Sequence, residues 1–299
     1  MSTVVRSMRS TLARAGVLLG ATLLTAGCAA QPGGGSASSP SSPSQTGAEL
    51  PADGLVLQVA YSGGFVPPPV TYTQLPLVSV YADGRVITEG PVIAIHPGPA
   101  LPNLQVSTIP TERVEELVRQ ALDAGVGEEF DYGMPPVADV PNTLFTVVTA
   151  DGTETTEVYA LQRGLFPEGE EVPGLTEDQV AARAELQELV DELTGLSSEG
   201  SEAYEPESIA AVASTNVLPG STPDDVATWP GPPLPGDELS TGLELYCVVA
   251  RDEAVAAVLE AAADATAETV WQNPDGGRWA LTLRPLLPHE SGCADLPTA

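Results

Sequence analysis

Alternation of apolar and polar residues predicts antiparallel hairpins in this chain. The segment LVSVYADGRVITEG alternates with a period of two on both sides of Asp83-Gly84, as half-buried strands do. Asp-Gly between two such runs favours a two-residue turn in which both turn positions take positive φ angles. The same pattern surrounds Asp151-Gly152 and the stretch from Asn273 to Gly277. Further strands are expected at 55–61, 209–214 and 243–250.

A period near 3.6 residues predicts the first of three amphipathic helices. Its apolar stripe runs from Val114 to Leu122, and the helix is expected to end at Gly125. Thr108 or Thr111 is the expected N-cap, because a threonine hydroxyl can accept a hydrogen bond from a free N–H of the first turn.

The second helix is expected to begin at Thr176, because Gln179 follows at the spacing of a capping box, and to stop at Gly195. The third spans about 252–264. Helices that interrupt or follow hairpins favour the α+β class, with antiparallel, hairpin-rich sheets, over a doubly wound parallel sheet.

Composition divides the chain into regions. The polar, acidic stretch 197–207 predicts a linker between two small α+β domains, 50–196 and 208–299. The proline-rich connection 217–242 is expected to be a loop, either ordered and functional or mobile.

The segment 1–27 has the pattern of an export signal. It begins with basic residues and no acid, and its apolar run Val17–Ala26 is too short to span a bilayer. Small residues then precede Cys28. Residues 28–49 are rich in Ala, Gly, Ser and Pro and cannot bury a core, so they predict a disordered, flexible tether.

The segment LLTAGC, from Leu23 to Cys28, resembles the lipobox of bacterial lipoproteins. In that family the cysteine thiol receives a diacylglyceryl group and becomes the mature N-terminus. The resemblance implies lipidation of Cys28, a lipid anchor as the contact with the membrane, and a location on the outer face of the plasma membrane. Ordinary cleavage after Ala30 is the alternative, and it would give a secreted protein.

The net charge of the chain limits the kinds of molecule that it can bind. The formal net charge is −30, and loss of Arg6, Arg9 and Arg14 with the signal would make it −33. Such a field repels nucleic acid and anionic lipid head groups. The expected partners are therefore a cell-envelope protein, a cell-wall component or a small neutral or cationic ligand, and no nucleic acid. The chain has no lysine, which excludes Walker A loops, pyridoxal chemistry and serine–lysine acyl transfer.

Two cysteines remain once Cys28 is acylated or removed. In an oxidising compartment such an even pair, Cys247 and Cys293, predicts a disulfide. Two separate buried thiols are the alternative.

Motifs for catalysis are absent from the sequence. It has two histidines, His96 and His289, and lacks GxSxG, HExxH, CxxC and GxGxxG. Both histidines lie beside prolines, where a surface or locally hydrogen-bonded role is the commoner one. No catalytic residue, cofactor or metal site is therefore expected.

An acidic loop with two aromatic residues, EEFDYGMPPVADVPNT at 128–143, is the strongest candidate for ligand binding. Three interpretations are open: a solvated loop, a loop that binds a cation or another ligand, or a catalytic loop. Catalysis of hydrolysis would need two carboxyl groups a short distance apart, one of them with a raised pKa. The candidate residues of the loop are Glu128, Asp131, Tyr132 and Asp139.

The tryptophans have different expected roles. Trp229, in ATWPGPP, could present its ring on a rigid proline scaffold to a sugar or peptide, or pack over the second core. Trp271 and Trp279 flank the third hairpin turn and are expected to pair across the strands.

The segments YADGRVI, PGPALPNL, DVPNTLFTV and LRPLLPHE look like a group of uncharacterised lipoproteins from high-GC Gram-positive bacteria. This resemblance implies location and a related fold but no catalytic residues. We therefore expect a membrane-anchored, extracytoplasmic lipoprotein of non-enzymatic, binding or interaction type, and the alternative is an extracytoplasmic hydrolase that uses paired carboxylates.

Overall fold

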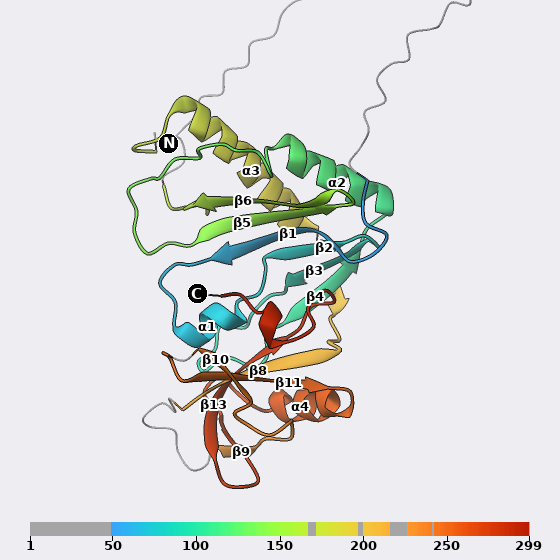
Figure 1. Ribbon diagram of the computed structural model, residues 1–299, viewed down its shortest axis with the longest axis vertical. Helices are drawn as coiled ribbons and strands as arrows, with labels where there is room; N and C mark the ends of the chain where they lie inside the picture. Colours follow the sequence, from blue (N-terminus) through green and yellow to red (C-terminus); the bar gives the residue numbers. More distant parts are fainter. Residues whose placement is uncertain (1–48, 167–171, 197–199, 216–225, 241, 299) are drawn as a thin grey trace, which may run out of the picture. The chain divides into compact units, whose positions relative to one another are not determined.

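The computed structural model describes residues 49–166, 172–196, 200–215, 226–240 and 242–298, all within one compact unit (Figure 1). The α+β class is confirmed: the described residues form helices and two mostly antiparallel sheets. The predicted signal, Cys28 and nearly all of the tether lie outside these residues, as does part of the connection 217–242. Within the described ranges, no helix is both long and apolar enough to cross a membrane.

The first sheet has seven strands in the order β6-β5-β1-β2-β3-β4-β7, and all neighbours are antiparallel. Its strands are β1 Leu55–Ser62, β2 Val78–Tyr81, β3 Arg85–Glu89, β4 Leu104–Thr108, β5 Asn142–Thr149, β6 Gly152–Tyr159 and β7 Glu202–Ala203.

Strand β7 lies within the stretch 197–207, expected as a linker, and its two residues pair with Gln105 and Val106 of β4. Both β7 side chains are exposed. The strand therefore has no apolar pattern by which the sequence could have marked it.

Two helices cover one face of this sheet (Figure 1): α2 Thr111–Asp123 and α3 Glu177–Gly195. Their apolar stripes, including Leu117 and Leu186, pack with the inward residues of the strands in one cluster. The capping box of α3 is confirmed, with Gln179 N donating to Thr176 Oγ1 at 3.2 Å and Thr176 N to Gln179 Oε1 at 2.9 Å. The threonine cap predicted for α2 is wrong, because the N-cap residue is Pro110 and Thr111 is already helical.

The three hairpins are confirmed, but their turns differ from the two-residue Asp-Gly type. The β2–β3 turn has three residues, 82–84, because β2 ends at Tyr81 and β3 begins at Arg85, and only Gly84 has a positive φ, of 88°. A Cβ on Gly84 would lie 2.2 Å from the carbonyl oxygen of Ile109. In the second hairpin Gly152 already pairs with Thr149, and the loop is Ala150-Asp151.

The second sheet has six strands in the order β10-β11-β8-β13-β12-β9, with a parallel pair between β9 and β12. Helix α4, Glu253–Ala263, packs on one face through Val255 and Val258. The strands are β8 Ser208–Ser214, β9 Val226–Thr228, β10 Asp237–Ser240, β11 Leu245–Arg251, β12 Val270–Gln272 and β13 Arg278–Pro285.

The stretches expected as two domains share hydrophobic clusters. Tyr72, from the short helix α1 Pro68–Thr73, packs with Val212 and Leu286 of the second half. In the other direction, Leu287 packs with Tyr81 of the first sheet. Sequence patterns missed α1 because it begins inside a proline run, although proline suits the first turn of a helix.

Replacing Thr176 with alanine removes the hydroxyl that accepts the Gln179 N–H. We expect the free energy of unfolding to fall by about 1 kcal/mol, whereas Thr176→Ser, which keeps the hydroxyl, should change it by less than about 0.5 kcal/mol. Urea unfolding followed by circular dichroism measures both variants. Equal stability of all three proteins would show that the cap contributes nothing.

Candidate functional site

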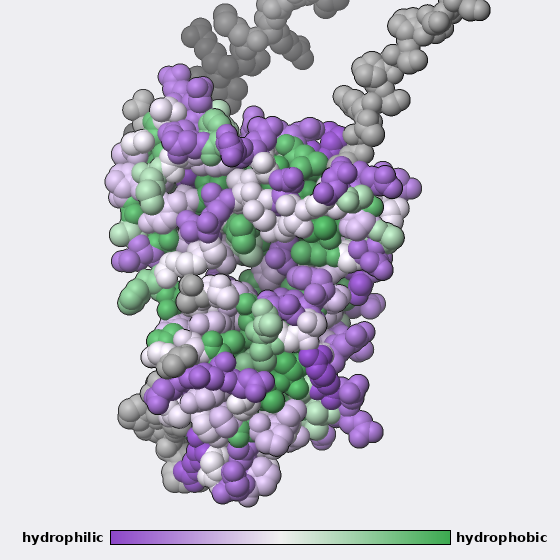
Figure 2. Space-filling view, in the orientation of Figure 1, coloured by the Kyte–Doolittle hydropathy of each residue, from purple (hydrophilic) through white to green (hydrophobic). Residues whose placement is uncertain are grey.

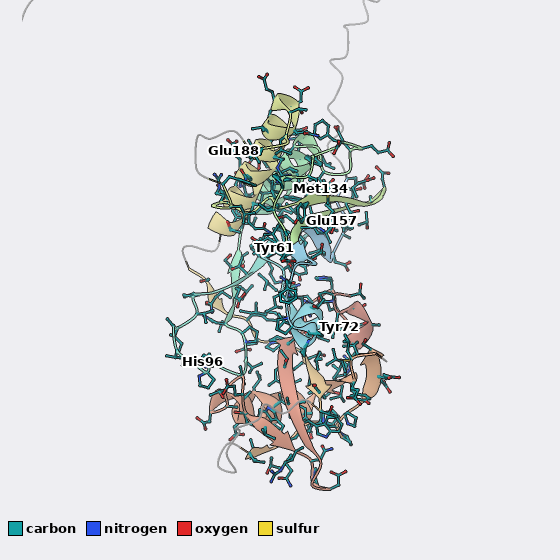
Figure 3. All side chains as sticks on the ribbon, turned by 90° about the vertical axis from the view of Figure 1, so that its left-hand side faces the viewer. Tyr61, Tyr72, His96, Met134, Glu157 and Glu188 are labelled. Atoms are coloured by element: carbon teal, nitrogen blue, oxygen red, sulfur yellow. A yellow bond between two sulfur atoms is a disulfide. The ribbon has the colours of Figure 1, made fainter. Side chains whose placement is uncertain are left out.

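A hollow of about 290 Å³ opens between β1, α1 and the C-terminal segment, which we define as residues 286–298. β5 also contributes to its wall through Leu144, and Tyr61, labelled in Figure 3, lies on the β1 side. The lining of the hollow combines apolar surface with polar side chains, among them Gln58, Ser62, Thr71, Gln74, His289 and Asp295.

The floor of the hollow follows from alternation along β1. Leu57 and Val59 are buried in the core under the helices. Because successive side chains of a strand point to opposite faces, Gln58 and Ala60 lie on the other face, where they line the hollow. Gln58 Nε2 donates to Ser79 Oγ at 3.0 Å, which orients its amide.

A buried ion pair holds the C-terminal segment, which forms another part of the lining. Arg284 Nη1 and Nη2 donate to the two oxygens of the Glu290 carboxylate at 2.6 and 2.7 Å. The side chains are only 1% and 6% exposed. The main-chain N–H of Leu287 adds a third hydrogen bond to this carboxylate, at 2.7 Å. Paired, charge-assisted hydrogen bonds of this kind offset the cost of removing both charges from water.

His289 lies at the edge of the hollow, with its Nδ1 3.0 Å from the hydroxyl of Tyr81. The residue is solvent-exposed, but protein surrounds part of the ring, and this partial burial lowers its pKa. Glu290 and Asp295 oppose the shift, and Arg284 adds to it. Neutral imidazole is therefore favoured at this position.

A turn and a disulfide fix the end of the C-terminal segment. Asp295 Oδ2 accepts hydrogen bonds from Ser291 N, Ser291 Oγ and Gly292 N at 2.6, 2.7 and 3.0 Å. These bonds lower the pKa of Asp295, because they favour the charged carboxylate. The Sγ atoms of Cys293 and Cys247 are 2.04 Å apart in a disulfide, which ties the segment to β11.

The candidate residues of the acidic loop 128–143 differ in burial. Glu128, Asp131 and Asp139 are exposed, whereas Tyr132 is buried in the core under the helices and its hydroxyl donates to Gly125 O at 3.3 Å. The ring of Tyr132 therefore contributes to the core of the first sheet. In the described part of the chain, no group of three or more His, Cys, Asp or Glu residues is placed to hold a metal ion.

Trp229 does not present its ring on the surface. It is 3% exposed, packs edge-to-face on Trp271 with ring centroids 5.5 Å apart, and donates from Nε1 to Pro232 O at 2.6 Å. The proline scaffold folds back over the second core, so the packing alternative holds. Trp271 and Trp279 pair across β12 and β13, as predicted.

The histidines occupy separate environments. The His96 side chain is 85% exposed and projects from its loop (Figure 3), with Nδ1 3.9 Å from Glu268 Oε1. His289 instead belongs to the hollow. Sequence reasoning missed Arg284 and Glu290, although an arginine inside the apolar run LTLRPLLP is a signal of a buried pair.

Comparison of the chain with protein-family models, with curated proteins and with solved structures gave no match.

Replacing Arg284 with methionine leaves the Glu290 carboxylate buried without its partner. We expect a loss of about 3–5 kcal/mol in the free energy of unfolding. Adding Glu290→Gln removes the unpaired charge and keeps an oxygen for the Leu287 N–H, so the double variant should recover about 2 kcal/mol. Denaturant unfolding tests both, and a double variant no more stable than the single one would contradict the assigned pair.

Stability should fall in acid partly through His289. Its pKa is lowered in the folded state, so the unfolded chain takes up the proton first; the loss begins as pH drops below about 6.5 and is complete below the lowered pKa. His289→Asn should reduce this loss. His96→Gln is the control and should retain it. Unfolding at a series of pH values measures the effect, and identical profiles for His289→Asn and the unaltered protein would refute it.

Proposed function

We propose that the protein is a lipid-anchored, extracytoplasmic binding protein of the cell envelope, and that it holds a small polar ligand in the hollow between β1, α1 and the C-terminal segment. The observation that carries this proposal is the hollow itself, an open space of about 290 Å³ with several polar side chains in its lining and a wall fixed by an ion pair and a disulfide. Ligand sites are commonly concave and largely pre-formed, as this one is.

The location rests on the N-terminal pattern. The resemblance of LLTAGC to a lipobox supports acylation of Cys28, and the segment that follows has the composition of a tether. A disulfide between Cys247 and Cys293 is compatible with an oxidising, extracytoplasmic compartment.

The lining favours a neutral or cationic molecule that carries hydroxyl or amide groups. Gln58 and Gln74 offer amides, and Ser62 and Thr71 offer hydroxyls. The Arg284 charge is already balanced by Glu290, whereas Asp295 adds a negative charge to the lining of a chain whose formal charge is −30. Anionic ligands are therefore disfavoured, and a neutral sugar or amino sugar fits this chemistry.

The alternative of hydrolysis by paired carboxylates has less support at this site. Hydrolysis of that kind needs one carboxyl with a raised pKa as the proton donor. The pKa of Asp295 is lowered, and both oxygens of Glu290 accept hydrogen bonds from Arg284. Binding without chemistry is the function that this geometry supports best.

Calorimetric titration with glucosamine, N-acetylglucosamine and glucuronic acid tests the ligand class, with the chain carrying Cys28→Ser so that it stays unlipidated. We expect one of the first two sugars to bind and glucuronic acid not to bind. Gln58→Ala and Gln74→Ala should each weaken binding about tenfold, the effect of one lost hydrogen bond. Gln105→Ala, on β4 outside the hollow, is the control. Binding of glucuronic acid alone, or equal effects of all three variants, would contradict the proposal.

Lipidation has its own test. Cells that express the unaltered chain should incorporate labelled fatty acid into it and retain it in the membrane fraction, because two or three acyl chains give stable anchoring. Cys28→Ser should abolish the label and release the protein. Membrane retention without label would contradict acylation of Cys28.

A further inference from the structure

One edge of the seven-stranded sheet is a long strand with a free side. β6 is the first strand in the sheet order, and all eight of its residues pair with β5. At the other edge, β7 has only two residues. An edge strand exposes a row of main-chain N–H and C=O groups that can pair with another chain. β6 is therefore the edge of this sheet that is long enough to accept a further strand.

The β5–β6 ladder shows which groups of β6 are free. Hydrogen-bonded and non-hydrogen-bonded pairs alternate along antiparallel strands. Just beyond the strand ends, Ala160 N donates to Pro141 O at 3.3 Å, so these two residues form a hydrogen-bonded pair. The next pair, Asn142 and Tyr159, is therefore non-hydrogen-bonded, and the two types alternate from there. Thr153, Thr155 and Glu157 then stand in non-hydrogen-bonded pairs, so their N–H and C=O groups point away from β5.

This row is open to solvent. Thr153, Thr155 and Glu157 are all exposed, and within the described ranges no hydrogen bond reaches their main-chain groups from outside the ladder. The row ends at Tyr159, whose carbonyl oxygen accepts a hydrogen bond from Arg183 Nη2 at 2.9 Å. Three successive outward-facing residues are thus available for pairing.

Acidic side chains border the row on both faces of the sheet. Glu157 (Figure 3) lies on the face opposite the helices, because its neighbour Val158 is buried beneath them. Glu154 lies on the helix face and close to Gly127: a Cβ added to Gly127 would be 2.8 Å from the Cβ of Glu154. Exposed Glu128 follows Gly127 directly in the chain.

Hydrogen bonds hold the charge of Glu157 in place. Its Oε1 accepts from Asn142 Nδ2 at 2.9 Å and from the hydroxyl of Ser62. A carboxylate fixed beside a free edge favours a cation at the adjacent position of an incoming strand.

We propose that β6 takes up an extended segment of a partner protein, rich in lysine or arginine, as an added strand of the sheet. The free N–H and C=O groups of Thr153, Thr155 and Glu157 supply the main-chain hydrogen bonds, and the acidic border selects the basic side chains. A second copy of this chain is a poor occupant, because pairing would bring together two acidic edges and two molecules with a formal charge of −30 each. The site depends on the backbone pattern of β6, and it shares one residue with the hollow, because Ser62 lines the hollow and donates its hydroxyl to Glu157.

The test uses the full chain with Cys28→Ser and a synthetic peptide of alternating lysine and valine, as long as β6, that is, eight residues. Titration calorimetry measures the Kd of the peptide for the chain, and amide hydrogen exchange by NMR shows where the peptide binds. We expect slower exchange at Thr153, Thr155 and Glu157. Thr155→Pro removes one outward N–H and leaves the β5 ladder intact, so it should raise Kd about tenfold. Thr155→Ala, which keeps the N–H, should leave Kd unchanged within about twofold.

Two further peptides test the same strand pairing without a change in β6. The peptide is N-methylated either at its lysines or at its valines, which preserves the charge and blocks alternate N–H groups. Since a strand pairs through alternate residues, one of the two should lose about tenfold in affinity. Equal binding of both methylated peptides, equal binding by the two Thr155 variants, absence of binding, or dimerisation of the chain through β6 would each overturn the proposal.

Discussion

The buried ion pair of Arg284 and Glu290 determines how the C-terminal part of the chain lies against both sheets. An arginine inside β13 cannot remain charged at 1% exposure without a partner, and the chain supplies that partner six residues later. When Arg284 and Glu290 pair, the N–H of Leu287 donates to the same carboxylate, and the side chain of Leu287 packs in the cluster of Tyr81. His289 then reaches the Tyr81 hydroxyl. One electrostatic requirement in the second sheet thus determines contacts with the first.

This placement produces the concave site. The C-terminal segment closes one side of a hollow whose floor is the face of β1 that the helices leave uncovered. A disulfide at Cys293 and the turn at Asp295 keep that side in place, so the wall is formed before a ligand binds.

The free edge of β6 offers a different kind of contact, through main-chain groups and acidic side chains. The face in Figure 2 is consistent with polar recognition, because its hydrophobic residues form separate groups among hydrophilic ones.

Local patterns predicted the elements better than the site. Thr176 and Gln179 marked the start of α3, since a capping box depends only on neighbouring residues. The Asp-Gly hairpins were found, but their turns depend on backbone contacts such as that of Gly84 with Ile109, which sequence does not show. The hollow could not be predicted, because β1, α1 and the C-terminal segment meet only in the folded chain. Trp229 was ambiguous for the same reason: proline content describes the stiffness of its loop and not the direction in which the ring points.

Amide hydrogen exchange at Leu287 in the unaltered protein tests most directly whether the ion pair holds the C-terminal segment. We expect this amide to exchange as slowly as those of central strand β8, because opening it requires breaking the buried pair and withdrawing Leu287 from its cluster. Exchange as fast as that of an exposed loop residue such as Glu129, with β8 still protected, would contradict this, and the hollow would then lack a fixed wall.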